Sequence, residues 1–429
     1  MAVISDMHLG AKWGTPREED SFDQAREAIE RALELGAQAI LIPGDIFDVR
    51  IPRQEVWARS MRVLSIPASV TNRGVNLLEG PGKEISDFSP LHFRGIPVIA
   101  IHGNHEKRTR GLVNPVEALE AAGLLVHLDR EFVMLEGGGE AVAVHGMSNV
   151  PEQHARSTLL SWNPKPLKDA VNLLMIHQSL GQFIYSSEEK PTLDIPDLPK
   201  GFDMYICGHI HERSESSAHG APLIFPGSTE RTQLLKAEAE SGKGFYIIDT
   251  KGFRYEFHEL TTTRDFYYEE MRFDGADPKF IEMSVRKKIE DFLGMPRRNT
   301  RKIPLVRIRL IGTLSRGSSR RDIDDGGISR EFEGRAIVNI GKGDLVSPEL
   351  EEKVQLLREL KERRLTIDET VQKLLEENLK DLGYSGVFDA VRLYEMLAED
   401  REGDAMRHIE MVIDSRVRTE AGDQDDNKG

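Results

Sequence analysis

Residue types that bind metals follow short apolar runs at five places in this chain. Taken alone, each place has an ordinary explanation, because an aspartate can cap a helix or turn and a single histidine is commonly a surface residue. Five in succession are expected to converge, since the carboxyl ends of buried strands meet at one edge of a sheet. The residues are Asp6 and His8, then Asp45, then Asn104 and His105, then His177, and last His209 and His211.

The chemistry of this set is that of two divalent ions. Besides His105, it offers two carboxylates, four imidazoles and one amide oxygen, too many ligands for one tetrahedral zinc. Mixed ligands of these kinds suit a pair of ions such as Mn²⁺, Fe²⁺ or Zn²⁺, about 3.5–4 Å apart. We expect Asp45 to bridge the pair, one ion through each oxygen. Such a pair activates water for attack on a phosphoryl group, so the site predicts hydrolysis of a phosphate ester.

Short buried strands are expected to carry these residues. Apolar runs that end in polar or glycine-containing turns are typical of strands covered on both faces. Helices are expected where apolar residues recur every three or four positions. The polar, aperiodic segment Thr71–Phe93 is expected to be an inserted loop, either functional or simply tolerated at the surface. The strands are Ala2–Ile4, Ala39–Ile42, Pro97–Ile101, Val171–Ile176 and Met204–Cys207, and the helices are Asp20–Leu35, Gln54–Leu64 and Val116–Ala122.

The length of 429 residues predicts more than one domain. Residues 1–261 read as one α/β domain. An amphipathic helix at Phe280–Leu293 and an alternating strand at Leu305–Leu310 predict a small α+β domain over residues 262–345. Helical periodicity then covers residues 346–415, and the polar tail, residues 416–429, is expected to be disordered.

Composition excludes several classes of protein. No apolar run approaches the roughly 20 residues of a membrane span, and no signal peptide is visible at the start of the sequence. The single cysteine, Cys207, fits a reducing cytoplasmic setting. The net charge of −15 argues against a general nucleic-acid binder, so any contact with DNA must come from local basic patches or from metal ions.

The order of the motifs resembles a known family. D-x-H, G-D-x-x-D, G-N-H-E, H and G-H-x-H, between Asp6 and His211, are the signature of calcineurin-like metallophosphoesterases. Closer cues are I-S-D-M-H-L-G, I-H-G-N-H, I-H-Q-S-L and P-G-S-T-E-R. With these the chain resembles, over residues 1–345, the SbcD or meiotic-recombination-eleven nucleases of double-strand-break repair, in particular archaeal ones. The resemblance implies a β-sandwich flanked by helices, a small α+β capping domain over the nuclease site, and a helical C-terminus.

The resemblance also implies roles for individual residues. It assigns Asp6, His8, Asp45 and His211 to one metal, and Asp45, Asn104, His177 and His209 to the other. His105 would contact the scissile phosphate and protonate the leaving 3′ oxygen. Asp48 stands where many relatives have histidine, and we expect its carboxylate to orient a histidine ligand. Two Mn²⁺ per subunit are implied, with Mg²⁺, Fe²⁺ or Zn²⁺ as other occupants.

A basic segment is expected to bind DNA. Residues 286–321 hold twelve lysines or arginines and only two acids in an otherwise acidic chain. The alternative is a solvated face, or, for the pair after the G-N-H-E loop, a balance of nearby acids. The candidates are Arg297, Arg298, Arg301, Lys302, Arg320 and Arg321 in the segment, with Lys107 and Arg108 after the loop.

Partners follow from the resemblance. The apolar faces of the C-terminal helices are expected to dock on the coiled-coil root of an ABC-type ATPase (SbcC or RAD-fifty), the alternative being packing on the chain's own capping domain. Gln54–Leu64 and Val116–Ala122 are the candidate contacts of a homodimer, unless their apolar faces are ordinary core. No membrane partner is expected.

The function implied is a Mn²⁺-dependent DNA nuclease of double-strand-break repair, cytoplasmic and associated with the nucleoid. It would combine 3′-to-5′ exonuclease activity on duplex DNA with endonuclease activity on single strands. One alternative is a phosphodiesterase or phosphatase that acts on a small nucleotide or a phosphoprotein, although such an enzyme needs neither the basic domain nor the helical tail. The other is a non-catalytic scaffold, which the complete ligand set argues against.

Overall fold

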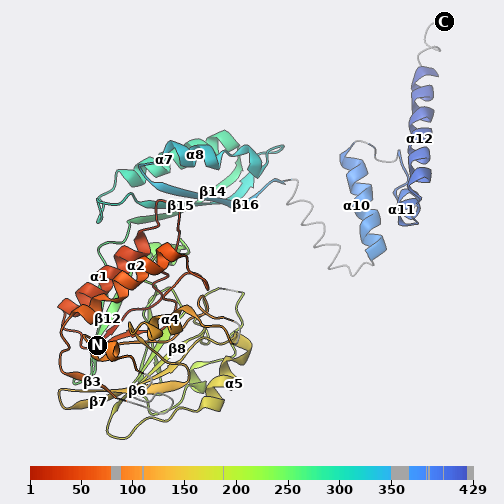
Figure 1. The fold of residues 1–429 in the computed structure, drawn as a ribbon. Coiled ribbons are helices and arrows are strands. Elements are labelled where there is room, and N and C mark those ends of the chain that lie inside the picture. The colour runs from red at the N-terminus through yellow and green to blue at the C-terminus, as the bar shows by residue number, and fades with distance from the viewer. Residues whose placement is uncertain are drawn as a thin grey trace. The chain divides into compact units, whose positions relative to one another are not determined.

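A computed structural model describes residues 1–78, 88–108, 111–186, 188–348, 367–382, 384, 387–399 and 401–422 (Figure 1). The chain divides into two compact units. The first comprises Met1–Arg272, Lys279–Ile311 and Asp324–Asp344, and the second Phe273–Pro278, Gly312–Ile323 and Leu345–Gly429.

Two sheets form the centre of the first unit. Parallel pairing joins several neighbouring strands within each sheet. The first sheet has the order β13 (Arg254–Glu259), β12 (Gly244–Asp249), β1 (Ala2–Val3), β2 (Ile40–Ile42), β4 (Val98–Ala100) and β5 (Val126–His127). The second has the order β10 (Ser214–Ala218), β11 (Ala221–Phe225), β9 (Met204–Gly208), β8 (Val171–His177), β7 (Glu140–Met147), β6 (Glu131–Gly137) and β3 (Val75–Leu78).

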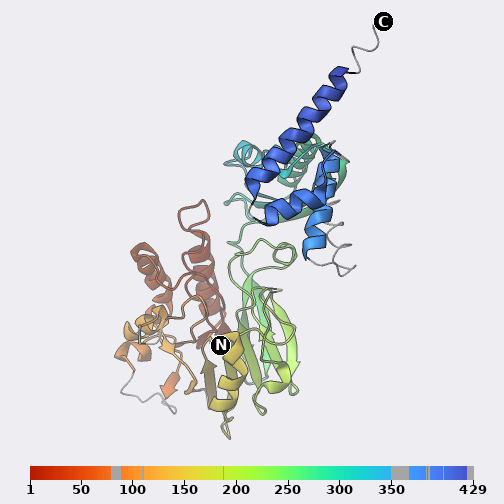
Figure 2. The same ribbon diagram turned by 90° about the vertical axis from the view of Figure 1, so that its right-hand side faces the viewer.

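The two sheets pack face to face, and helices cover their outer faces. Alternation within β2 shows why its whole sequence is apolar: Leu41 belongs to the core between the sheets, whereas Ile40 and Ile42 pack under the helices. In Figure 2 the early helices, red and brown, lie on the left of this unit and the yellow-green strands on the right. The expected α/β sandwich flanked by helices is confirmed.

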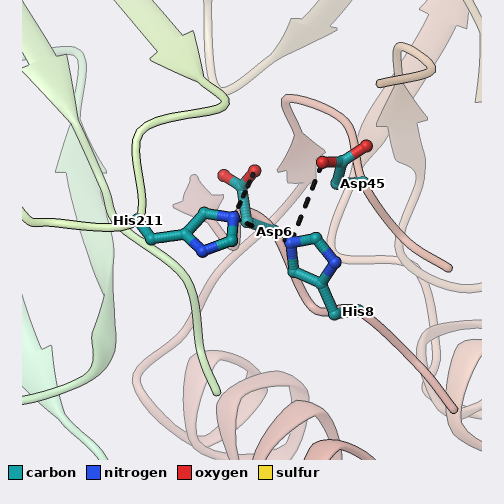
Figure 3. Close-up of side chains that lie close together, drawn as sticks. All are labelled: Asp6, His8, Asp45 and His211. Carbon is teal, nitrogen blue, oxygen red and sulfur yellow. Dashed lines mark hydrogen bonds and ion pairs between the residues drawn. The ribbon is translucent and has the colours of Figure 1, made fainter. Parts of the chain in front are cut away.

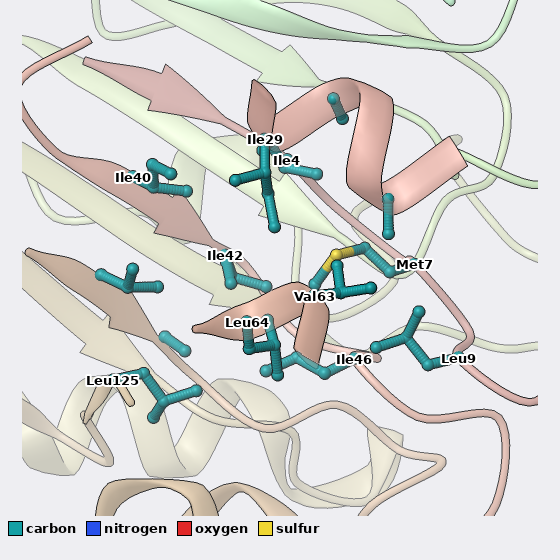
Figure 4. Packing of buried hydrophobic residues seen from close by; sticks show 14 of the residues in the cluster. Ile4, Met7, Leu9, Ile29, Ile40, Ile42, Ile46, Val63, Leu64 and Leu125 are labelled. Atoms are coloured by element: carbon teal, nitrogen blue, oxygen red, sulfur yellow. The ribbon is translucent and has the colours of Figure 1, made fainter. Parts of the chain in front are cut away.

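The helices that cover the first sheet are amphipathic. Ile29 of α1 (Asp20–Glu34) and Val63 and Leu64 of α2 (Gln54–Leu64) pack against Ile4, Ile40 and Ile42 (Figure 4). The helix α4 (Pro115–Ala121) begins at an Asn114 cap, whose Oδ1 accepts hydrogen bonds from two backbone amides. Residues 1–261 also form the helices α3 (Ile66–Ser69), α5 (Glu152–Trp162) and α6 (Lys236–Glu240), with 3-10 turns η2 (Pro90–Phe93) and η3 (Ile195–Asp197).

Two expectations about this unit need correction. The segment Thr71–Phe93 is not loop throughout, because β3 pairs antiparallel with β6 and η2 forms a turn. Val75 and Leu77 point into the core between the sheets, a two-residue alternation too short to stand out in a polar stretch. Residues 79–87 lie outside the described part. The ligand-bearing strands also do not share one sheet, since β1, β2 and β4 belong to the first and β8 and β9 to the second.

A third sheet follows in sequence. It has the order β14 (Phe266–Ala276), β15 (Leu305–Leu314) and β16 (Ile337–Val346), with α7 (Pro278–Leu293), η4 (Arg320–Asp322) and α8 (Asp325–Glu331) between its strands. On α7, Ile281, Val285 and Ile289 recur every four residues and are all buried. The α+β character expected for residues 262–345 is present. The domain boundaries themselves stay predictions.

The C-terminal segment is helical where it is described. Its helices are α10 (Ile367–Asp381), α11 (Ala390–Ala398) and α12 (Glu402–Gly422). The last continues beyond residue 416, where a disordered tail was expected to start, and residues 423–429 lie outside the described part, as do 349–366. Within the described residues, no helix is long and apolar enough to cross a membrane.

Candidate metal centre

The polar residues after the five strands lie close together although they come from two sheets. Asp6 and His8 follow β1, Asp45 follows β2, and Asn104 and His105 follow β4. His177 ends β8 in the second sheet, and His209 and His211 follow β9. We call these eight residues the ligand edge. Its members come together because the same ends of both sheets face each other across the sandwich.

One group in the ligand edge consists of Asp6, His8, Asp45 and His211. All four are buried, and one candidate ligand atom from each lies within 4.8 Å of the others. Figure 3 shows the four side chains gathered together, with dashed lines that join Asp6 to His211 and His8 to Asp45. The Nε2 atoms of His8 and His211 are 2.9 Å apart, and His8 Nε2 is 3.8 Å from Asp45 Oδ2. This is the set that the resemblance assigns to one metal.

The second group consists of Asp45, His177 and His209, again within 4.8 Å, with Asn104 beside them. Asn104 Oδ1 is 3.2 Å from His177 Nε2 and 3.1 Å from His209 Nδ1. His177 Nε2 is 3.4 Å from Asp45 Oδ2. Asp45 therefore faces both groups with the same oxygen, Oδ2, while its Oδ1 accepts the backbone amide of His105 at 3.0 Å. This differs from the expected use of one oxygen for each ion.

Each histidine of the two groups has a partner on the ring nitrogen that faces away. His177 Nδ1 donates to the carbonyl oxygen of Pro43 at 2.7 Å, and His211 Nδ1 donates to Thr232 Oγ1 at 2.6 Å. His8 Nδ1 lies 3.3 Å from Asp48 Oδ1, and His209 Nε2 lies 3.3 Å from Glu189 Oε1. A neutral imidazole that donates outward presents a lone pair inward, which is what a metal ion requires. The donor set therefore fits two divalent ions.

The electrostatics of the site also call for cations. Burial raises the pKa of Asp6, whereas burial and the neighbouring His8 hold the pKa of His211 well below its usual value. Burial opposes the charge of His177, but the Asp45 carboxylate raises its pKa to about 9. A proton on His177 can balance the Asp45 carboxylate, and a divalent ion bound at this point would take the place of that proton.

Backbone geometry aims these side chains. Asp6, His8, Asp45 and His209 have φ values of 48°, 45°, 49° and 83°, a region that residues other than glycine seldom adopt and that clusters at functional sites. Gly103 allows the loops to touch, because a Cβ there would lie 2.0 Å from Asp45 Oδ1. The sharp turns and close approaches explain why glycines flank the ligands.

His105 and Asp48 lie at the rim of the site. His105 is about a third exposed (30%), and its Nδ1 donates to the backbone carbonyl of Asp48 at 2.6 Å, which leaves Nε2 for a substrate. Burial opposes ionisation of Asp48, but His8 and then His105 lower its pKa. Its carboxylate lies 3.3 Å from His8 Nδ1, and its role in orienting this histidine stays a prediction.

Three further residues contact the loops or the histidines of the site. Glu106 is buried and accepts the amides of Phe47 and Gly103, both at 2.8 Å, and so joins two ligand loops. Burial and the Asp45 charge raise its pKa to about 8. Thr232 and Glu189 contact ligand histidines from distant loops. Only Glu106 could have been found, because it belongs to the G-N-H-E motif.

The basic candidates lie in varied settings. Lys107 and Arg108 are half-buried, and burial lowers the pKa of Lys107. Lys302 pairs with Asp20 at 2.9 Å and Asp23 at 2.7 Å, and Arg298 pairs with Glu259 at 2.6 Å. Arg297 and Arg301 form no ion pair with the described residues, whereas Arg320 and Arg321 belong to η4 in the second unit.

Comparison with known proteins agrees with this geometry. Residues 1–213, which contain the whole ligand edge, match the calcineurin-like phosphoesterase family. The chain therefore contains a calcineurin-like metallophosphoesterase domain, and it is a hydrolase. The family and enzyme class expected from the motifs are confirmed.

Curated relatives share one description. The DNA double-strand break repair protein Mre11 of Methanopyrus kandleri is 28% identical over 287 residues, which cover 62% of this chain and 58% of that protein. The Mre11 of Sulfolobus acidocaldarius is 26% identical over 321 residues, 72% of this chain and 74% of that protein. The double-strand break repair protein MRE11 of Arabidopsis thaliana is 25% identical over 362 residues, 72% of this chain but 49% of that protein. The matches thus span between half and three quarters of these relatives.

Proposed function

We propose that this protein is a DNA nuclease of double-strand-break repair that uses two Mn²⁺ ions. The observation that carries the proposal is Asp45 Oδ2, which lies 3.8 Å from His8 Nε2 and 3.4 Å from His177 Nε2 and so joins two ligand groups. The names of the relatives supply the substrate class. The activities proposed are 3′-to-5′ exonuclease on duplex DNA and endonuclease on single strands, in the cytoplasm at the nucleoid.

The mechanism follows from the residues at the rim. When bound, the ions supply Lewis acidity that neutralises phosphoryl charge and lowers the pKa of water. His105 is held by the Asp48 carbonyl through Nδ1, so its orientation is fixed while Nε2 carries the proton to the leaving oxygen. The Asp48 carboxylate also lies beside this ring, 4.0 Å from His105 Nδ1.

The test is cleavage of a 3′-labelled DNA duplex with Mn²⁺, with Mg²⁺ and with EDTA. We expect release of label with Mn²⁺, and about 10²- to 10⁴-fold slower release by His105→Ala with both ions still bound. His154→Ala, at an exposed histidine of α5, is the matched control. Hydrolysis of bis-p-nitrophenyl phosphate without any cleavage of DNA would instead favour the phosphodiesterase alternative.

The C-terminal helices carry exposed apolar side chains that suit a partner protein. Val371, Val391 and Leu397 are apolar and exposed within the second unit, whereas Leu393 is buried. We propose that this face docks on a coiled-coil ABC-type ATPase. Val391→Asp with Leu397→Asp should abolish co-elution with such an ATPase and leave the nuclease rate of the chain alone unchanged. Unchanged co-elution would reject the assignment of this face.

A homodimer is the remaining part of the proposal. The apolar faces of α2 and α4 are buried in the core of their own unit, so they are not free for a partner. Exposed apolar side chains nearby are Met61, Leu112 (53%) and Val113 (64%). We propose that these form the contact, and Leu112→Glu with Val113→Glu should convert the dimer to a monomer in analytical ultracentrifugation. A wild-type chain that sediments as a monomer would contradict it.

A further inference from the structure

Glu189 contacts both the metal centre and a neighbouring segment, and its two oxygens divide these contacts. Oε1 lies 3.3 Å from Nε2 of His209. Oε2 accepts the backbone amide of Tyr185 at 3.1 Å and the hydroxyl of Ser179. Glu189 is half-buried, and its carboxylate accepts hydrogen bonds on both sides.

The contact with His209 selects one ring nitrogen. His8, His177 and His211 face their groups with Nε2, whereas His209 faces Asn104 with Nδ1. A neutral imidazole carries its proton on either nitrogen, and a carboxylate at Nε2 favours the proton there. Nδ1 then keeps its lone pair for the second ion.

The contact with Tyr185 fixes the position of an aromatic ring. The ring of Tyr185 stacks on His209 with centroids 5.3 Å apart and meets His211 edge-on at 4.9 Å. Glu189 is the acceptor for the backbone amide of Tyr185, and Ser179, its other partner, lies two residues after the ligand His177. One carboxylate thus connects the loops of two ligands with residues 180–186.

We propose that Glu189 is a positioning residue: Oε1 holds His209 with Nδ1 toward the second ion, and Oε2 holds residues 180–186 with Tyr185 against the histidines. This inference rests on the proposed dinuclear centre. It predicts an effect on the second ion, bound by His177, His209, Asn104 and Asp45, and little effect on the first.

The test compares Glu189→Ala and Glu189→Gln with Glu188→Ala, which removes the same charge at the exposed neighbour. Calorimetric titration of the full chain with Mn²⁺ should show two ions in wild type. Glu189→Ala should bind the second ion about 10- to 100-fold more weakly and the first with unchanged affinity. Glu189→Gln should recover most of the loss, because its amide oxygen can accept from His209.

Two measurements do not depend on metal loading. Long-range proton–nitrogen spectra of metal-free protein with ¹⁵N-histidine should show His209 protonated at Nε2 in wild type and at both nitrogens in exchange in Glu189→Ala. Hydrogen exchange of the peptide 180–186 should accelerate in Glu189→Ala and not in Glu188→Ala.

Three results would overturn the inference. They are a wild-type His209 protonated at Nδ1, an unchanged second ion in Glu189→Ala, and equal weakening of both ions together with a lower melting temperature in EDTA. A wild-type chain that binds no second ion would instead reject the proposed dinuclear centre, which separates the two failures.

Discussion

Six of the eight side chains of the ligand edge are buried, whereas the basic side chains of the basic segment, Arg286–Arg321, are half-exposed or exposed. Residue types in the sequence therefore predicted the surroundings of the ligand edge better than those of the basic segment. Five basic side chains of the segment pair with acids that lie outside it in sequence, so the excess of twelve over two is not an excess of free charge. The pairs are Arg286 with Glu282 and Glu331, Lys288 with Glu269, Arg298 with Glu259, Lys302 with Asp20 and Asp23, and Arg309 with Glu270 and Asp344.

The difference teaches that position decides what a charged residue does. A strand end places a ligand by topology, so short motifs suffice to predict it. An arginine on a long flexible side chain is neutralised or left free by whichever acid folds next to it, and the sequence window does not contain that acid. Four substitutions or conditions, ordered by expected effect, test this contrast.

Arg264→Met should have the largest effect. The guanidinium is buried and donates to Asp20 at 2.6 Å, to the Ile303 carbonyl at 2.8 Å and to the Pro16 carbonyl at 2.7 Å. Breaking a buried pair typically costs about 3–5 kcal/mol of unfolding free energy. The surface pair of Arg298, whose side chain is 83% exposed, should cost at most about 1 kcal/mol in Arg298→Met. Urea denaturation measures both, and equal costs would remove the distinction between buried and exposed pairs.

His145 tests the effect of burial on a histidine that lies outside the ligand edge and packs against aromatic rings. Its ring stacks on Phe132 and meets Phe202 edge-on, and burial lowers its pKa from 6.5 to about 4. Between these pH values His145 is protonated in the unfolded chain but neutral in the folded chain. The free energy of unfolding therefore decreases as pH falls from 6.5 toward 4. The loss should reach up to about 3 kcal/mol. His145→Phe should flatten this part of the stability profile relative to His154→Phe, and an unchanged slope would assign the effect to other groups.

Gly103→Ala tests how closely the ligand loops fit. The new Cβ would lie 2.0 Å from Asp45 Oδ1 and 2.6 Å from the Asp45 backbone nitrogen, so the loop must shift. A displacement near 1 Å typically costs about 100-fold in rate. Gly343→Ala, where a Cβ meets no atom within 4 Å, is the control. Wild-type turnover of Gly103→Ala on bis-p-nitrophenyl phosphate with Mn²⁺ would show that the edge tolerates movement.

Arg301→Gln should have the smallest effect. The side chain is exposed and forms no ion pair with the described residues, so it is free to contact a phosphate. Loss of one such contact should weaken binding of all DNA sequences alike and reduce the salt dependence of log Kd by about one. Arg298→Gln, already paired with Glu259, should change the slope less. Equal slopes for both variants would show that pairing does not decide which arginines bind DNA.

Much of the fold and of the site was predictable from sequence because both depend on local patterns. Runs such as Ile40–Ile42 are buried on both faces and announce the strand, and Asp45 and His177 follow strands directly. The division into two sheets was not predictable, since a parallel strand reads alike in either. Thr232 and Glu189 were missed because nothing near them in sequence marks their contact with a histidine.

Because the candidate ligands come from both sheets, bound ions would also link the two layers of the sandwich. Asp45 and Asn104 come from one layer of the sandwich, and His177 and His209 from the other, joined in sequence only through long intervening chain. Binding free energy therefore resists separation of the layers, and at a free concentration 100-fold above Kd each ion adds about 2.7 kcal/mol to that resistance. Removal of the metal should weaken the packing between the two sheets before it disturbs the structure of either sheet alone.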